Sequence, residues 1–352
     1  MGMQRQLQII FLLGTILIKF FIICWDARRI RTFYQQIPKS KPSKSSSPDF
    51  TQLKMRQEHR RRIIRELCSE NSSLNFKEKS ITFDQIPNTA LNHLIVDDHH
   101  GVIYCFVPKV GCTNWKRVML VLSQNLKAPD GVQYLDPLDI PINLVHDSPL
   151  HKTFNKLRTR FGEHSVPLMH HKLKNYTKFL FVRDPFVRLI SAFRDKFLKP
   201  DDYFYNTYGS VMLQRYASIS TPPKSVKKAF AAGIRLSFSH FIKYLLDPQT
   251  EKTTPFNEHW QQMYRLCHPC QIEYDFIGKL ETLDEDAEHL LKILGLDKYI
   301  HFPPGYENRT ALDWEQEWFA NISVADRRKL YHLYETDFRF FEYDKPKTLL
   351  DE

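Results

Sequence analysis

One short loop in the sequence carries a lysine, a glycine, a threonine and an asparagine directly after a stretch of strand character. The apolar run GVIYCFV, residues 101–107, is typical of a buried strand, and NWKRVMLVLSQNL, residues 114–126, has helical character. Between them lie Lys109, Gly111 and Thr113, and Asn114 opens the helix. Amide groups at a helix start attract negative charge, so this turn is suited to a phosphate-like anion. The Walker pattern GxxxxGK[ST] is absent, so the nature of the ligand must be found by another route.

A second strand-to-helix turn has the same plan. The apolar run KFLFV, residues 178–182, is followed by Arg183, Asp184 and Pro185. Asp184 suits the cap position of a helix and Pro185 its first turn. The helix then predicted carries Ser191 and one apolar stripe, formed by Phe186, Leu189, Ile190, Phe193 and Phe197. Arg183 could bind a second anion, although a structural Arg183–Asp184 ion pair and a surface hydroxyl at Ser191 also fit these residues.

Buried strands that alternate with helices predict an α/β fold with a central parallel sheet flanked by helices on both faces. Further helices are expected at 225–246, 282–294 and 324–337. The segment RQEHRRRIIREL, residues 56–67, has the pattern of a short basic helix with a solvated, charged surface. In open α/β sheets ligands bind at the carboxyl ends of the strands, which is where both turns lie.

Taken together, the two motifs resemble a known family. PKVGCTNWKR and KFLFVRDPFVRLISAFRDKF are similar to segments of the Golgi carbohydrate sulfotransferases, in the group of the chondroitin 4-O-sulfotransferases and the human-natural-killer-epitope sulfotransferases. The similarity continues through IPNTALNHLIVDDHHGVIYC, PFNEHWQQMYRLCHPCQIEYDFIGKLETLDED and FEYDKPKTLL. It therefore covers most of the chain beyond residue 80. The resemblance implies a P-loop-like sulfotransferase fold.

The resemblance also implies a donor and its binding residues. The donor would be PAPS, 3′-phosphoadenylyl sulfate, and no metal is expected. The 5′-phosphosulfate would lie against the first loop, which consists of Pro108, Lys109, Val110, Gly111, Cys112, Thr113 and Asn114. The 3′-phosphate would lie against the second segment, chiefly at its two ends; its residues are Arg183, Asp184, Pro185, Phe186, Val187, Arg188, Leu189, Ile190 and Ser191.

The implied reaction is transfer of a sulfuryl group to a sugar hydroxyl, the 4-hydroxyl of N-acetylgalactosamine in chondroitin. Lys109 is placed to stabilise the charge that grows on the leaving phosphate. The acceptor hydroxyl needs a general base. His146, in NLVHDSPLH, and His259, beside Glu258 in FNEHW, are the candidates, and His170 and His171 are the next.

The N-terminal part predicts a membrane-anchored protein. Residues 1–6 form a short cytoplasmic tail, and the apolar run 7–25 is long enough for a retained signal anchor. Residues 26–75, rich in Pro, Ser and Lys, predict a lumenal stem, and 76–352 the lumenal catalytic domain. Charge beside the span mildly favours the opposite orientation. The sequons at Asn71, Asn175, Asn308 and Asn321 favour a lumenal body. These features predict a single-pass type II membrane protein with a lumenal body, and the resemblance implies that the membrane is that of the Golgi.

The net charge of +10 does not indicate nucleic-acid binding. Residues 27–65 hold twelve Lys or Arg and two acids, so this segment accounts for the whole excess and the remainder is neutral. The basic balance belongs to the segment near the membrane. The partners that the resemblance implies are the Golgi membrane and a glycosaminoglycan acceptor chain.

Six cysteines are compatible with an oxidising compartment. Cys24 lies in the apolar run, which leaves Cys68, Cys105, Cys112 and the CHPC pair, Cys267 and Cys270. Five thiols allow at most two disulfides. The CHPC pair could suggest zinc, but no second Cys or His pair at ligand spacing accompanies it, so a disulfide or a structural pair is favoured.

Other functions fit parts of the pattern. The acceptor could be dermatan or the glucuronate 3-hydroxyl of a glycoprotein glycan. A chain with a basic stem could also be a non-catalytic, membrane-anchored glycosaminoglycan-binding protein. A nucleotide kinase with an unusual P-loop would need a magnesium-binding Asp, and the sequence offers no convincing one.

Overall fold

The computed structural model describes residues 50–304 and 314–351, which belong to one unit, Pro48–Glu352. The expected membrane anchor, the first half of the stem and Asn308 lie outside the described residues. Among the helices of the described residues, none is both long enough and apolar enough to cross a membrane.

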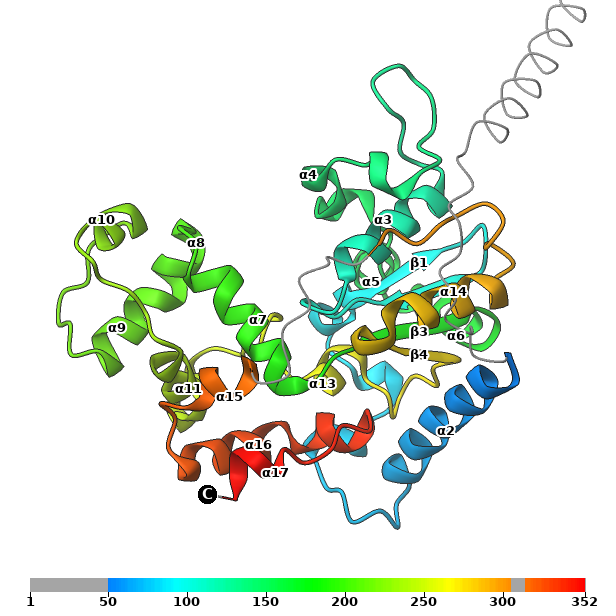
Figure 1. Ribbon diagram of the computed structural model, residues 1–352. Coiled ribbons are helices and arrows are strands. Elements are labelled where there is room, and N and C mark those ends of the chain that lie inside the picture. Colours follow the sequence, from blue (N-terminus) through cyan, green and yellow to red (C-terminus); the bar gives the residue numbers. More distant parts are fainter. Residues whose placement is uncertain (1–49, 305–313, 352) are drawn as a thin grey trace, which may run out of the picture. The chain divides into compact units, whose positions relative to one another are not determined.

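Four strands form one sheet in the order β1-β2-β3-β4 (Figure 1). They are β1 (Leu94–Asp97), β2 (Val102–Cys105), β3 (Thr177–Val182) and β4 (Phe276–Lys279). β2, β3 and β4 are parallel, whereas β1 pairs with β2 in the antiparallel direction through a tight turn. The expected parallel sheet is therefore mostly parallel. Nearly every strand residue is buried, as in a sheet covered on both faces.

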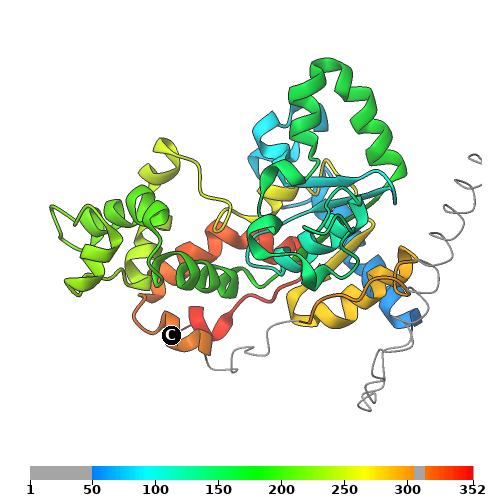
Figure 2. The ribbon, with the colours of Figure 1, turned by 90° about the horizontal axis from the view of Figure 1, so that it is seen from above.

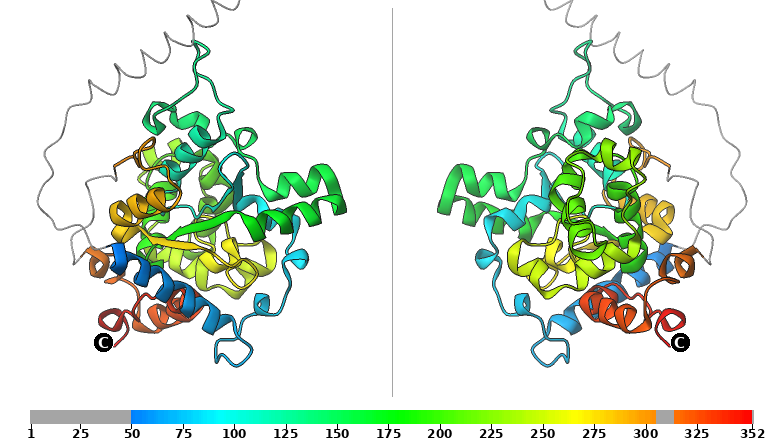
Figure 3. Two further views of the ribbon diagram at one scale, coloured as in Figure 1. Left: turned by 90° about the vertical axis from the view of Figure 1, so that its right-hand side faces the viewer. Right: turned by 90° about the vertical axis from the view of Figure 1, so that its left-hand side faces the viewer.

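The unit has a sheet region and a helical region (Figures 1 and 2), and each contains a large cluster of buried apolar side chains. The sheet region buries the strands against α2 (Phe50–Cys68), α3 (Cys112–Ser123), α5 (Phe154–Phe161), α6 (Ser165–Asn175), α13 (Met263–Cys267) and α14 (Leu283–Ile293). The short α4 (Ile142–Val145) packs beside α3. Helices α5 and α6 form a hairpin that projects from this region (Figure 3).

The helical region follows α7 (Pro185–Phe197), which leaves the end of β3. Its other helices are α8 (Asp202–Phe204), α9 (Ser210–Tyr216), α10 (Val226–Ala231), α11 (Phe238–Leu246), α12 (Pro248–Thr253), α15 (Trp314–Phe319), α16 (Val324–Phe340) and α17 (Lys347–Leu350). The predicted stripe of α7 is confirmed, since all five of its apolar side chains are buried in this core. Asp184 caps α7 as expected, because its carboxylate accepts from the amides of Phe186 and Val187.

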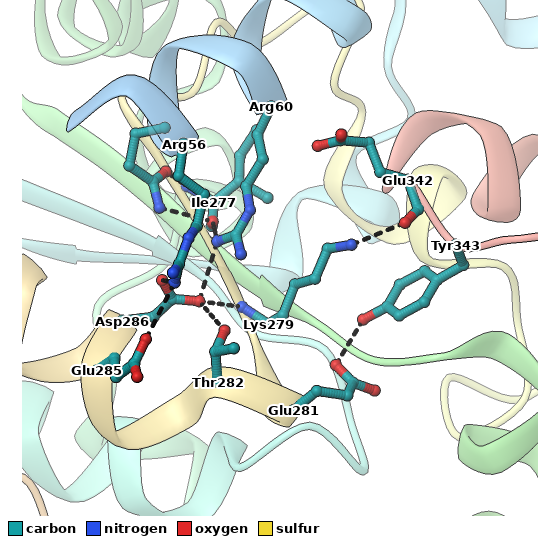
Figure 4. Close-up of polar contacts among 11 residues, drawn as sticks. Arg56, Arg60, Ile277, Lys279, Glu281, Thr282, Glu285, Asp286, Glu342 and Tyr343 are labelled. Atoms are coloured by element: carbon teal, nitrogen blue, oxygen red, sulfur yellow. Dashed lines mark hydrogen bonds and ion pairs between the residues drawn. The ribbon is translucent and has the colours of Figure 1, made fainter. Parts of the chain in front are cut away.

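Helix α2 lies inside the segment that the sequence assigns to the stem, yet its side chains form hydrogen bonds with the backbone of the edge strand β4. β4 is an edge strand, and the amide side chain of Gln57 donates to the carbonyl of Ile277 and accepts from its N–H, at 3.1 and 2.9 Å. Arg60 donates to the same carbonyl and to buried Asp286 at 2.9 Å (Figure 4). These contacts satisfy an open strand edge. The folded unit thus takes in residues well before 76. The predicted basic helix is present with an exposed charged face, but Gln57, Arg60 and Ile64 are buried against the body.

The other predicted helices differ in detail. The helix expected at 225–246 is two helices, α10 and α11, because Gly233 adopts a positive φ of 71° after α10. The helices expected at 282–294 and 324–337 are α14 and α16, the latter three residues longer. The helix after the first loop begins at Cys112, two residues earlier than predicted.

Candidate active site

The loop after β2 and the helix start after β3 lie side by side. β2 and β3 are parallel neighbours, so their carboxyl ends meet at the same edge of the sheet. Arg183 donates through Nη1 to the carbonyl of Lys109 at 3.3 Å. Arg188 donates through Nε to the carbonyl of Pro108 at 3.0 Å. The two segments selected from the sequence are therefore joined directly.

The first loop holds an unusual backbone conformation at the candidate catalytic lysine. Lys109 has a φ of 74° and Gly111 a φ of 79°, both in the left-handed region. Glycine adopts this region freely, but a residue with a Cβ does so at a cost, and such residues are over-represented at functional sites. No side chain caps the helix that starts at Cys112. The first turn of α3, with Thr113 and Asn114, therefore presents uncapped backbone beside Lys109.

The ammonium group of Lys109 points toward α7. Its Nζ lies 3.0 Å from a carboxylate oxygen of Asp195, and Lys196 contacts the same oxygen at 3.3 Å. Burial lowers the pKa of Lys109, and the pairing with Asp195 opposes that effect. Burial alone would raise the pKa of Asp195, but the two ammonium groups outweigh it and hold this pKa well below its ordinary value. Ser191 lies one helical turn before Asp195 and is partly exposed on α7.

The residues of the second segment divide into two kinds. Arg183 and Ser191 are partly exposed. Arg188 is only 1% exposed, and it also donates to the carbonyls of Gln261 and Glu258, both at 2.7 Å. All three groups to which it donates are main-chain carbonyls, so Arg188 holds loops together. Pro185, Phe186, Leu189 and Ile190 are buried in the core and Val187 is half-buried.

Asp184 also belongs to the framework of the site. Its backbone N–H donates to Oε1 of Glu281 at 3.0 Å, and the hydroxyl of Tyr343 donates to Oε2 of that glutamate at 2.8 Å (Figure 4 shows the Tyr343 contact). Burial raises the pKa of Asp184 to about 6, against the two amides that its carboxylate accepts from. Thus the turn after β3 is fixed by the turn after β4, and no Arg183–Asp184 ion pair is needed to explain it.

Both histidines proposed as the base lie beside the first loop. His146 places Nε2 3.2 Å from the hydroxyl of Thr113. Nδ1 of His259 lies 2.6 Å from Oδ1 of Asn257. Burial lowers the pKa of both rings, and nearby ammonium groups lower it further, to about 2 for His259. Lys109 is one of those ammonium groups at His259.

The two alternative histidines lie elsewhere. His170 is exposed on α6 and pairs with Asp84 at 2.9 Å. His171 is exposed on the same helix and contacts Asn175. Neither makes a contact with the loop of Lys109, so the structure gives no support to them as the base.

The comparisons with known proteins agree with this geometry. A model of the sulfotransferase family matches residues 92–344. The chain belongs to the sulfotransferase family. Carbohydrate sulfotransferase 12 of Mus musculus is 60% identical over 294 residues, which is 84% of this chain and 70% of that protein. The Xenopus laevis protein of the same name is 56% identical over 296 residues, with the same coverage. Carbohydrate sulfotransferase 11 of Rattus norvegicus is 42% identical over 292 residues, or 82% and 76% of the two chains. No solved structure matches this chain.

Several residues of this sulfotransferase site were not selected from the sequence. Asp195 and Lys196 could have been found, because they lie one turn beyond Ser191 on the predicted helix. Lys116 of α3 is 9% exposed, and its Nζ lies 3.6 Å above the ring of Phe106. No sequence signal distinguishes this buried lysine from the others in the chain. Its contact depends on how α3 packs on the strand.

The cysteines of the described residues form two disulfides, Cys68–Cys270 and Cys105–Cys267. Both cysteines of CHPC are thus in disulfides with distant partners, which confirms the preference for a disulfide over zinc. Cys112 keeps a free thiol in the first loop, and burial raises its pKa. Within 50–304 and 314–351, no cluster of His, Cys, Asp and Glu is suited to a metal ion.

Proposed function

We propose that this sulfotransferase transfers the sulfuryl group of PAPS to the 4-hydroxyl of N-acetylgalactosamine in chondroitin. The observation that carries the proposal is the direct connection of the two turns through Arg183 and Arg188 to the loop of Lys109. A nucleotide with a phosphate at each end needs two anion sites at one sheet edge. The names of the relatives, carbohydrate sulfotransferases 11 and 12, support a sugar acceptor.

The donor fits residues of both segments. Residues 108–114 would hold the 5′-phosphosulfate through Lys109, Thr113 and the uncapped start of α3. Residues 183–191 would hold the 3′-phosphate through Arg183 and Ser191, which remain accessible beside the loop. We assign this arrangement to a P-loop-like sulfotransferase fold. Arg188 and Asp184 would act by fixing the two turns.

The bound donor supplies the activated sulfuryl group, and its leaving group is a phosphate. Lys109 would stabilise the charge that develops there, since a cation fixed at a partly buried site needs no reorganisation during the reaction. Asp195 holds the ammonium group of Lys109 in place through their 3.0 Å contact. In-line positioning and electrostatics dominate such transfers, and no metal is required in this proposal.

A proton must also leave the acceptor hydroxyl. His146 and His259 are the candidates from the sequence, and both adjoin the loop. The lowered pKa of each weakens it as a base, which is most marked for His259. His146 can also orient the hydroxyl of Thr113 toward the donor.

The proposal includes the location of the protein in the cell. We place the protein in the Golgi membrane, anchored by residues 7–25 with its body in the lumen. Two disulfides suit an oxidising compartment. Asn71, Asn175 and Asn321 are exposed, as glycan acceptors must be.

The full chain tests this function in an assay with radiolabelled PAPS. Desulfated chondroitin, dermatan and a glucuronate-terminated glycan are offered in parallel. We expect label mainly in chondroitin, with sulfate at the 4-position of N-acetylgalactosamine. Preference for either of the other acceptors would replace the acceptor in the proposal. Binding of chondroitin without any transfer would favour a non-catalytic glycosaminoglycan-binding protein instead.

A further inference from the structure

A glutamate beside the candidate site is paired with a buried imidazole that the site does not otherwise use. Oε2 of Glu258 lies 3.3 Å from Nε2 of His93. His93 is 4% exposed and stacks on Phe106, with ring centroids 4.3 Å apart. Lys116 lies over the same Phe106 ring. The carboxylate of Glu258 therefore contacts a buried stack formed by His93, Phe106 and Lys116.

The position of the hydrogen on His93 follows from its partners. Nδ1 lies 2.7 Å from the carbonyl of Phe106, and a carbonyl can only accept, so Nδ1 carries the hydrogen. Burial lowers the pKa of His93 to about 4, so near neutral pH the ring is uncharged and Nε2 carries a lone pair. This lone pair faces the carboxylate. The two groups are thus arranged to accept one proton between them.

Glu258 is fixed relative to the first loop. Its main-chain carbonyl accepts from Nη2 of Arg188 at 2.7 Å, and Nε of the same arginine holds the carbonyl of Pro108. Its side chain is 37% exposed, so it can still reach an acceptor. The charged and titratable groups around it are Lys116, Arg188, Lys196, His146, His93, Cys112 and Tyr208.

Two other groups near the loop, Asp195 and His259, are poorer proton acceptors. Asp195 is neutralised by Lys109 and Lys196 and keeps a low pKa. His259 has a pKa of about 2. By contrast, burial raises the pKa of Glu258 despite the surrounding cations, which makes this carboxylate a stronger base than Asp195 or His259.

We propose that Glu258 is the general base of the sulfuryl transfer and that His93 is its positioning residue. The acceptor oxygen forms a bond to the sulfur of the donor while its proton moves to Oε2 of Glu258. The bond from that sulfur to the bridging phosphate oxygen breaks, and the electron pair stays on the departing adenosine 3′,5′-bisphosphate. The proton then leaves the Glu258–His93 pair to solvent. This inference rests on the proposed function.

The test compares variants of the full chain by steady-state kinetics and by calorimetric titration with adenosine 3′,5′-bisphosphate. Glu258→Gln keeps the main-chain carbonyl that Arg188 holds and removes only the base. We expect kcat to fall about 10²-fold or more, with nucleotide affinity unchanged. Glu258→Asp should recover part of the rate. Glu288→Gln, in an exposed pair with Lys292, is the matched control and should match the wild type.

His93→Gln tests the positioning role. Since His93 sets the environment of the carboxylate, we expect the acidic limb of the kcat profile against pH to move, whereas Glu258→Gln should remove that limb. A purely structural role would lower stability and leave the limb in place.

Retention of wild-type kcat in Glu258→Gln would overturn the inference. A much larger loss of kcat in His146→Ala than in Glu258→Gln would make His146 the general base. An unaltered acidic limb in His93→Gln would remove His93 from the mechanism. If the wild type neither transfers sulfate nor binds adenosine 3′,5′-bisphosphate, it is the proposed function that fails.

Discussion

The turns after β2 and β3 each connect a strand to a helix, but the two turns have different physical roles. The turn after β2 holds Lys109 and Gly111 in left-handed conformations and has no side-chain cap on its helix. The turn after β3 is capped by Asp184 and sends Arg183 and Arg188 into hydrogen bonds with carbonyls of the first. The first turn thus keeps an unusual backbone conformation, and the hydrogen bonds from the second turn hold that conformation.

This difference shows how a binding motif should be interpreted. The nine residues of the second segment resemble a phosphate-binding motif, yet its most buried cation, Arg188, donates only to main-chain carbonyls. Arg183 and Ser191 remain accessible. We infer that one arginine of the motif meets the ligand and the other builds the site.

The largest effect is expected for Arg188→Ala. The change leaves one buried and two partly buried carbonyls without their donor and removes a buried side chain, so it should lower the free energy of unfolding by about 4 kcal/mol. Urea denaturation measures this loss. Arg183→Ala is the comparison, and it should cost far less stability while weakening the binding of adenosine 3′,5′-bisphosphate. Equal destabilisation by both changes would contradict the structural role of Arg188 and the ligand-binding role of Arg183.

Lys109→Ala should affect rate rather than stability. Loss of the cation at the leaving phosphate should lower kcat by about 10²- to 10³-fold, as is typical when one such stabilising group is removed. Lys199→Ala provides the control, because this exposed lysine contacts the same Asp195 from the opposite oxygen. A kcat of Lys109→Ala near that of the wild type would remove the lysine from the chemistry.

The pKa shifts of His93 and Asp184 should make the stability of the protein respond to pH in opposite directions. His93 has a folded pKa of about 4, below its ordinary 6.5, so its contribution to stability is present above pH 6.5 and is lost as the pH falls toward 4, on the order of 3 kcal/mol. Asp184 has a folded pKa of about 6, above its ordinary 3.8, so its contribution is present below pH 3.8 and is lost as the pH rises through 6.

Urea denaturation between pH 4 and 7 separates these contributions. His93→Gln should flatten the rise of stability with pH, whereas Asp184→Asn should steepen it. Parallel curves for the wild type and both variants would show that neither group titrates as its burial implies.

The smallest effect concerns the backbone of Lys109. Glycine adopts a φ of 74° without strain, so Lys109→Gly should be about 1 kcal/mol more stable than Lys109→Ala, while both should have the same low kcat. Thermal denaturation of the two variants measures the difference. A less stable glycine variant would mean that the left-handed turn is not maintained in solution.

Local patterns were sufficient for the second turn. The spacing of five apolar residues, together with Asp184 and Pro185, predicted α7 and its cap correctly. Parallel order at the carboxyl ends of the strands predicted that the two turns would meet, and β2 and β3 are neighbours. These features depend on residues close together in the sequence or on general rules of α/β sheets.

Features that depend on distant partners could not be predicted in this way. The role of α2 depends on Gln57 and Arg60 meeting Ile277 and Asp286, more than 200 residues away. The basic composition of this helix indicates an exposed surface and gives no sign of those contacts. Likewise, nothing near Glu258 in the sequence points to His93, and the disulfide partners of Cys267 and Cys270 could not be assigned.

A crystal structure of the full chain with adenosine 3′,5′-bisphosphate would test the central claim most directly. We predict the 5′-phosphate at the loop of Lys109 and the start of α3, and the 3′-phosphate at Arg183 and Ser191, with Arg188 still bound to its three carbonyls. A nucleotide bound at another edge of the sheet, or with either phosphate away from these two turns, would contradict the account.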